Sequence, residues 1–119
     1  MRRLGPVTAI DILQVSTATA TREAAIELAQ SVVQARLAAS AQVHGPAASV
    51  FWHEGEFGSG EEWILLLKTT TDRYAELEAH LVANHPWSNP EVVAVPVAAG
   101  AAHYLDWVRR TTSQTRSNG

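Results

Sequence analysis

Two stretches of the chain are apolar without interruption, and they limit the folds that the sequence can adopt. Residues 63–67 read Trp-Ile-Leu-Leu-Leu, and residues 92–95 read Val-Val-Ala-Val. A half-buried strand normally alternates apolar residues toward the core with polar residues toward water, but here both faces are apolar. Each such side chain left in water loses about 1.5–3 kcal/mol of burial, and a contiguous exposed patch marks an interaction surface. The pattern therefore predicts a sheet whose second face is covered by other subunits.

The alternative is that the C-terminal part of the same chain covers this face. Residues 101–111 have a helical pattern, with Tyr104, Leu105 and Val108 along its apolar edge. So short a helix is too small to cover a sheet of four strands. Oligomerisation is the favoured interpretation.

Extended and helical patterns alternate along the rest of the chain. Segments rich in β-branched and apolar residues predict strands at residues 8–16, 40–57, 61–70 and 90–97. Helical periodicity follows Thr21 and returns from about Asp72 to Asn84. With the short last helix, the order is β-α-β-β-α-β-α, which is the ferredoxin-like split βαβ arrangement with one added helix. The expected fold class is α+β, a βαββαβ sandwich with an antiparallel sheet.

Individual residues predict the ends and faces of these elements. Thr21 is the expected N-cap of the first helix, and Pro86 is expected to end the second, since the residue before proline avoids helical angles. Gly45-Pro46 predicts a bulge or a bend, and Gly58-Ser59-Gly60 predicts the hairpin turn. The residues expected to face the core from the two helices are Ile26, Ala29, Val33, Leu37, Tyr74, Leu77 and Leu81.

The composition excludes several classes of protein. The 119 residues suffice for a single domain, expected to be ordered over about residues 8–111 with a polar tail at 112–119. The absence of cysteine removes disulfides and thiol catalysis. With a net charge of −3 and scattered basic residues, the chain has no concentrated positive charge that would attract nucleic acid. No apolar run reaches the roughly 20 residues that cross a membrane, and Asp11 interrupts any signal-peptide core, so we expect a cytoplasmic protein.

Four segments resemble, in order, those of the CutA divalent-cation-tolerance proteins. They are RLAASAQV at residues 36–43, SVFWHEGEFGSGEEWILLLKTT at 49–70, HPWSNPEVVAVPV at 85–97 and HYLDWV at 103–108. The resemblance spans about residues 10–110. It implies a ferredoxin-like subunit in a tight homotrimer, in which long hairpins pair between subunits, with an architecture similar to that of PII signalling proteins. It also implies a role in the response to divalent metal ions.

His85 corresponds to the His-Pro position at which this family is proposed to bind metal. The resemblance thus makes His85 a candidate ligand for copper(II) or zinc, with Glu91 near it across the turn. The alternative is that His85 only ends the helix and donates to a nearby carbonyl. One histidine is not a metal site, because zinc or copper needs three or four ligands, so no cofactor is predicted to be obligatory.

Two serines stand where members of the family often carry cysteine. They are Ser16, early in the chain, and Ser40, in the Leu-Ala-Ala segment. Copper(I) favours soft thiolate or thioether ligands, and the chain has none beyond Met1. Thiol-based copper binding is therefore excluded.

A weaker metal candidate lies beside the expected hairpin turn, where His53, Glu54 and Glu61 gather with other carboxylates. Such a cluster could hold a divalent ion weakly. The alternative is a solvated, charged hairpin end that resists edge-to-edge pairing.

A second kind of site is a cleft between subunits. Lys68 follows five apolar residues and is expected at the edge of the core, where it could reach such a cleft together with Trp52, Tyr104 and Trp107. A small anionic ligand there would make the protein a PII-like regulatory module. The structural alternative is that the lysine only packs its aliphatic part on the core and extends its ammonium group to water. The chain has no nucleophile elbow, zinc-protease motif or phosphate loop, so no enzyme is predicted.

Overall fold

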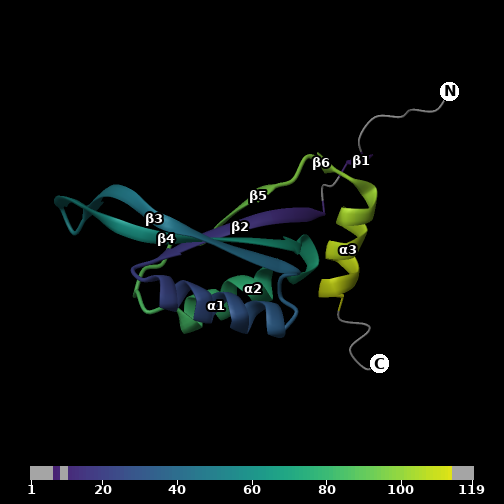
Figure 1. Cartoon of the computed structure of the whole chain (residues 1–119), viewed down its shortest axis with the longest axis horizontal. Helices are drawn as coiled ribbons and strands as arrows, with labels where there is room; N and C mark the ends of the chain where they lie inside the picture. The colour runs from purple at the N-terminus through teal and green to yellow at the C-terminus, as the bar shows by residue number, and fades with distance from the viewer. Residues whose placement is uncertain (1–6, 9–10, 114–119) are drawn as a thin grey trace.

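The sheet of this protein has two helices on one face, and a third helix packs at one end of the other face. The computed structural model describes residues 7–8 and 11–113. In order, the elements are β1 (Val7–Thr8), β2 (Ile12–Thr19), α1 (Arg22–Gln34), β3 (Ser40–His53), β4 (Glu56–Thr70), α2 (Thr71–Asn84), β5 (Val93–Pro96), β6 (Ala99–Gly100) and α3 (Ala102–Thr112). The main sheet is antiparallel with strand order β3-β4-β2-β5, and α1 and α2 lie together beneath it (Figure 1). The predicted α+β, ferredoxin-like class is confirmed.

The first and last strands differ from their predicted bounds. β2 begins at Ile12 and continues to Thr19, whereas Thr8 belongs to β1, which pairs with β6 in a separate two-stranded sheet. Residues 9–10 of the predicted strand lie outside the described residues. β5 is shorter than predicted because it pairs only with Leu13–Ser16 of β2. At the C-terminal end, Thr112 is the buried last residue of α3 rather than the start of a tail, and residues 114–119 lie outside the described residues.

The hairpin between β3 and β4 turns earlier than predicted. Its two central residues are Glu54 and Gly55, with φ values of 51° and 83°, as a two-residue type I′ turn requires. The prediction of a turn at Gly58-Ser59-Gly60 is wrong, because these residues continue β4 and pair with residues 49–51 of β3. The glycine-rich composition suggested positive φ there, but a glutamate occupies the first turn position.

The predicted bulge at Gly45-Pro46 is confirmed, since the register of β3 against β4 shifts between His44 and Ala47. The side chain of Trp63 also lies very close to the backbone of Gly45. A Cβ atom there would lie 2.6 Å from Cε3 of Trp63 and 3.1 Å from the carbonyl oxygen of Glu62. The indole ring of Trp63 therefore packs directly over the glycine backbone.

We accordingly expect Gly45→Ala to lower the free energy of unfolding by about 1–3 kcal/mol, the usual cost of forcing extra volume into a packed site. Denaturant titration measures this loss. Gly60→Ala is the matched control, because a Cβ at Gly60 meets no atom within 4 Å. Equal stability of the two variants would contradict the packing described for Trp63.

The two helices bury slightly different stripes from those predicted. Thr21 caps α1 by accepting a hydrogen bond from the Ala24 amide at 3.1 Å, as predicted. The core-facing residues of α1 are Ala25, Leu28, Ala29 and Val32. Ile26 and Val33 are only half-buried, because the buried stripe is displaced by one residue, and Leu37 is buried beyond the helix end. In α2, Leu77 and Leu81 are fully buried as predicted, whereas Tyr74 is half-buried.

The cross-strand register separates the two faces of the sheet. Val15, Leu65 and Leu67 face α1 and α2 and are fully buried in the main core. On the opposite face, which we call the open face, residues pair in two rows across β3, β4, β2 and β5: Ser40–Lys68–Gln14–Val95 and Gln42–Leu66–Ser16–Val93. The prediction that the continuous apolar strands place apolar residues on both faces is therefore confirmed.

The last helix covers only one end of the open face, where Ile12 lies on the same side of β2 as Gln14 and Ser16. α3 stands at one end of the sheet, away from the hairpin turn (Figure 1), and its Leu105 and Val108 pack on Ile12 and Ala39. Val93 and Val95 keep 47% and 52% of their surface exposed. Tyr104 is also exposed rather than part of the apolar edge of the helix. One subunit thus leaves much of the apolar surface of its second face in contact with water.

Candidate functional site

His85 ends α2 and holds the proline-bracketed turn that follows. The backbone amide of Trp87 donates to Nδ1 of His85 at 3.1 Å. Nδ1 is therefore unprotonated, so Nε2 carries the hydrogen and donates it to the carbonyl oxygen of Ala18 at 2.8 Å. The ring is buried, and the Trp87 ring lies beside it at 5.1 Å between centroids. His85 thus ends the helix and donates to a carbonyl, the two features that the structural alternative from the sequence described.

The role of His85 and Glu91 as metal ligands stays a prediction. Both imidazole nitrogens already carry hydrogen bonds within the subunit, so coordination at His85 would have to displace one of them. Glu91 is exposed after the turn. Within residues 11–113, no group of three or more histidine or acidic side chains is placed to hold a metal ion. A complete ligand set is therefore not formed by this part of one subunit.

The acidic hairpin cluster is only partly brought together. Nε2 of His53 lies 3.8 Å from a carboxylate oxygen of Glu54, and both side chains are highly exposed at the turn. Glu61 pairs with Ala48, five positions along β4 from Glu56, the cross-strand partner of His53, which corresponds to roughly 17 Å of strand. The arrangement fits a solvated hairpin end better than a compact ion site.

Lys68 is the one charged side chain in the two polar–apolar rows of the open face. It is half-buried between Ser40 on β3 and Gln14 on β2. No carboxylate lies within ion-pair distance of it among the described residues. Ser16 and Ser40 lie on this same face, in adjacent rows.

The aromatic residues of the predicted cleft lie at opposite ends of the subunit. Trp52 is near the hairpin turn, 74% exposed, with its ring edge-to-face with Phe57 at 5.8 Å. Tyr104 and Trp107 lie on α3 with ring centroids 5.7 Å apart. Because the turn and α3 are far apart in Figure 1, one subunit cannot form a cleft from all of them with Lys68. The predicted cleft therefore requires a neighbouring subunit.

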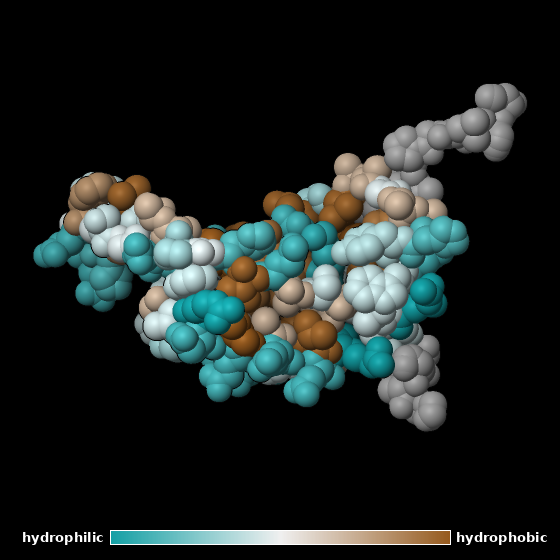
Figure 2. Space-filling view, viewed as in Figure 1, coloured by the Kyte–Doolittle hydropathy of each residue, from teal (hydrophilic) through white to brown (hydrophobic). Residues whose placement is uncertain are grey.

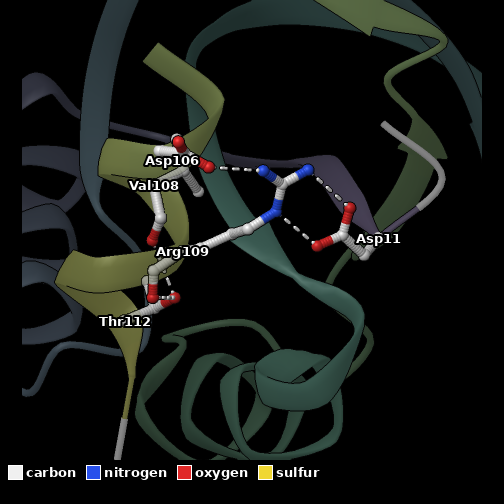
Figure 3. A network of polar contacts seen from close by, with 5 residues as sticks. All are labelled: Asp11, Asp106, Val108, Arg109 and Thr112. Atoms are coloured by element: carbon white, nitrogen blue, oxygen red, sulfur yellow. Dashed lines mark hydrogen bonds and ion pairs between the residues drawn. The ribbon is translucent and has the colours of Figure 1, made fainter. Parts of the chain in front are cut away.

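An ion-pair network that the sequence analysis missed fixes α3 to the start of β2 (Figure 3). Arg109 donates from Nε and Nη2 to the two carboxylate oxygens of Asp11, at 2.7 and 2.9 Å, and from Nη1 to Asp106 at 2.9 Å. The spacing of Asp106 and Arg109, three residues apart on a helix, was a usable signal. Asp11 is 98 residues away in sequence, so no local pattern could reveal it.

This pair predicts a small loss of stability in acid. Hydrogen bonds from Arg109 hold the pKa of Asp11 below its ordinary value of 3.8. Because the folded-state pKa is the lower one, the pair stabilises the protein above the ordinary pKa, and the contribution is lost as pH falls through the folded-state pKa. The effect on stability is small, because the side chains of Asp11 and Arg109 are 42% and 33% exposed and water screens the pair. Unfolding free energies of wild type and Asp11→Asn should therefore differ at neutral pH and converge once the pH has fallen below the lowered pKa of Asp11; a constant difference would contradict this.

Comparisons with known proteins agree with the fold. Residues 13–111 match the model of the CutA1 divalent ion tolerance protein family. The chain is 39% identical over 90 residues to the divalent-cation tolerance protein CutA of Thermus thermophilus, covering 76% of this chain and 87% of that protein. It is 38% identical over 91 residues to the chloroplastic protein CutA of Arabidopsis thaliana, covering 76% of this chain and 50% of that longer protein.

A solved structure extends the similarity to three dimensions. The structure of CutA from Synechococcus elongatus superposes with a TM-score of 0.86 at 28% identity, covering 92% of this chain and 96% of that one. Across the described residues, no helix is long and apolar enough to cross a membrane. With a family model that spans most of the chain and a relative of 39% identity, the chain belongs to the CutA1 divalent ion tolerance protein family.

Proposed function

We propose that this protein acts in divalent ion tolerance as a homotrimer without enzymatic activity, and that the assembled form binds copper(II) or another divalent cation such as zinc. Family membership and the names of its relatives support the role in divalent ion tolerance. The structural observation that carries the proposal is the open face, most of which a single subunit leaves uncovered. The absence of catalytic activity stays a prediction.

Two apolar surfaces support self-association. One is the open face around Leu66, Val93 and Val95. The other is the end of the hairpin, where Val50, Phe51, Trp52 and Phe57 are exposed and apolar residues gather at one tip of the molecule (Figure 2). Exposed apolar patches of this kind mark interaction surfaces. A closed ring of identical subunits would cover both, because each subunit offers one hairpin and one face.

Assembly also offers a route to a metal site. Copper(II) and zinc need three or four ligands, and the described part of one subunit groups no three of the required side chains. In a trimer, candidates from neighbouring subunits can meet at an interface, and any candidate near the threefold axis is present there in three copies. The candidates remain His85 and Glu91, with His53, Glu54 and Glu61 as weaker ones, and without thiols the ligands would be imidazole nitrogen and carboxylate oxygen.

Calorimetric titration of the assembled protein with copper(II) and zinc tests this proposal. We expect saturable binding at neutral pH that weakens below about pH 6.5, because imidazole must be neutral to coordinate. Tight copper(I) binding that survives at about pH 5 would contradict a ligand set without sulfur. No binding of either divalent cation would overturn the cation-binding part of the proposal.

A PII-like role is the second candidate, and Lys68 is the observation that favours it. A half-buried lysine with no carboxylate partner among the described residues can bind an anion. The same titration with nucleotides and small organic acids tests it, with Lys68→Met as the variant that should lose binding. The predicted cytoplasmic location and the absence of nucleic-acid or membrane partners also stay predictions.

A further inference from the structure

Helix α3 is held in a small apolar cluster of its own. Its buried apolar side chains, Leu105 and Val108, pack with Ile12 and Ala39. The buried residues of the main core come instead from β2, α1, β4, α2 and the turn after α1. Thr112 is also buried, but its hydroxyl donates to the carbonyl oxygen of Val108 within the same helix. Segments with few buried apolar contacts open at a lower free energy than the whole domain, and α3 is such a segment.

Two arginines link α3 to the rest of the subunit at its surface. Arg109 donates to both carboxylate oxygens of Asp11, which precedes β2 (Figure 3). Arg36, which follows α1, donates from Nη1 to the carbonyl oxygen of Thr111 at 3.0 Å. Asp11 and Arg109 are partly exposed, and Arg36 is exposed. Water and salt screen the charges of such contacts, so these links can break without disturbing the main core.

A cavity of about 530 Å³ lies between the C-terminal end of α3, the start of α2 and the start of β2. Its wall includes Asp11 and Arg109 of the surface link, together with Asp72 and Arg73 of α2. Arg73 lies on the buried stripe of α2, and its Nη1 pairs with Glu76 of the same helix. Protein interiors are otherwise close-packed. On this side, α3 therefore borders a cavity where packed side chains would hold it more firmly.

The surface beneath α3 is one end of the open face. Ile12, which α3 covers, pairs with Thr70 of β4. The next residue pair on the same side is Gln14 with Lys68, which belongs to the first row of the open face. With α3 in place, Ile12 and Ala39 are 0% and 6% exposed. Opening of α3 would expose both and would enlarge the apolar part of the open face.

We propose that α3 is a lid on the end of the open face, which opens as a unit while the sheet, α1 and α2 stay folded, and that the contact between Arg109 and Asp11 holds it closed. The chain can turn between Pro96, the last residue of β5, and Ala101, the residue before α3. Openings of single elements are common in folded proteins. The lid does not depend on the proposed cation binding, but its opening changes the area of the surface proposed for self-association.

Native-state hydrogen exchange of the full chain, followed by nuclear magnetic resonance, tests the proposal. After correction for intrinsic rates, the amides of Val108 and Arg109 should exchange at least about tenfold faster than those of Leu77 and Leu81, because opening α3 alone needs less free energy than unfolding the subunit. Amides along α3 should give one opening free energy. Equal protection of α2 and α3 would overturn the proposal, as would protection that falls gradually toward the helix end, which indicates fraying. Wild-type data decide both points.

A substitution in the main core separates local opening from unfolding of the whole subunit. Val32 is fully buried in that core. Val32→Ala should speed the exchange of Leu77 and Leu81 at least about tenfold through lost packing. It should leave Val108 and Arg109 unchanged, because the main core stays intact when α3 opens. An equal acceleration in both helices would mean that α3 opens only with the whole subunit, and would overturn the proposal.

Substitutions at the surface link test what holds the lid closed. Asp11→Asn should speed the exchange of α3 about twofold to fivefold, as expected for a partly exposed ion pair, and about 1 M sodium chloride should act similarly on wild type. Asp106→Asn is the matched control, because it removes only the partner of Arg109 that lies within α3, and it should have a smaller effect. A larger effect for Asp106→Asn than for Asp11→Asn would overturn the role given to Asp11.

Discussion

Replacing Leu66 with lysine should turn the assembled protein into folded monomers, whereas the same change at the neighbouring Leu65 should unfold the chain. Leu66 lies on the open face between Gln42 and Ser16, where a lysine can reach water once the subunits separate. Leu65 is fully buried against the helices. An unpaired charge at that position costs several kcal/mol, a large part of the roughly 5–15 kcal/mol that stabilises a domain.

Light scattering and circular dichroism measure the two outcomes together. Wild type should have three times the 12.9 kDa of one chain, and Leu66→Lys should have the mass of one chain with an unchanged helical and strand spectrum. Gln42→Lys, on the same row but already polar, is a milder control. A wild-type protein that is monomeric at micromolar concentration would contradict the interpretation of the open face.

His85→Ala should produce the second large effect, a loss of about 2–4 kcal/mol in the free energy of unfolding. The change removes the donor to the Ala18 carbonyl and the acceptor of the Trp87 amide. Each buried group left without a partner costs about 1–3 kcal/mol, and the vacated ring volume adds to this. Thermal or denaturant unfolding measures the loss.

His53→Ala is the matched control for this change, because His53 is exposed at the hairpin turn and its loss should alter stability by less than about 0.5 kcal/mol. A copper(II) titration on both folded variants then tests the ligand role. We predict a larger loss of affinity for His85→Ala than for His53→Ala. The reverse order would move the metal site to the hairpin, and an unchanged affinity in both would leave His85 a structural residue only.

Local patterns were sufficient to predict the order of the main elements from β2 to α3, because each depends on residues close in sequence, whereas the short β1 and β6, which pair with each other, were missed. The Thr21 cap, the bulge at Gly45-Pro46 and the stop before Pro86 are all set by neighbouring side chains and backbone angles. The open face was also predictable, since an uninterrupted apolar strand must place such residues on both faces. The hairpin turn was missed because Glu54 is an unusual residue at a positive φ.

The features that depend on residues far apart in the sequence could not be predicted from the sequence alone. The partner of His85 is the carbonyl of Ala18, 67 residues earlier, and the partner of Arg109 is Asp11. Arg73 could have been noticed, because a charged residue precedes Leu77 and Leu81 at helical spacing on a buried stripe. The separation of Trp52 from Tyr104 and Trp107 follows from the length of the hairpin, which moves its turn away from α3 (Figure 1).

Titration of copper(II) into wild type and into monomeric Leu66→Lys, in the same buffer at neutral pH, tests most directly whether assembly creates the cation site. If ligands from several subunits are needed, wild type should bind one ion per trimer at a site on the threefold axis, or one ion per chain at a site between neighbouring subunits. The folded monomer should then bind at least about tenfold more weakly, because it has lost ligands of a site that needs three or four. Equal affinity in the two proteins would show that a single subunit holds the whole site, and would contradict a cation site made by the trimer.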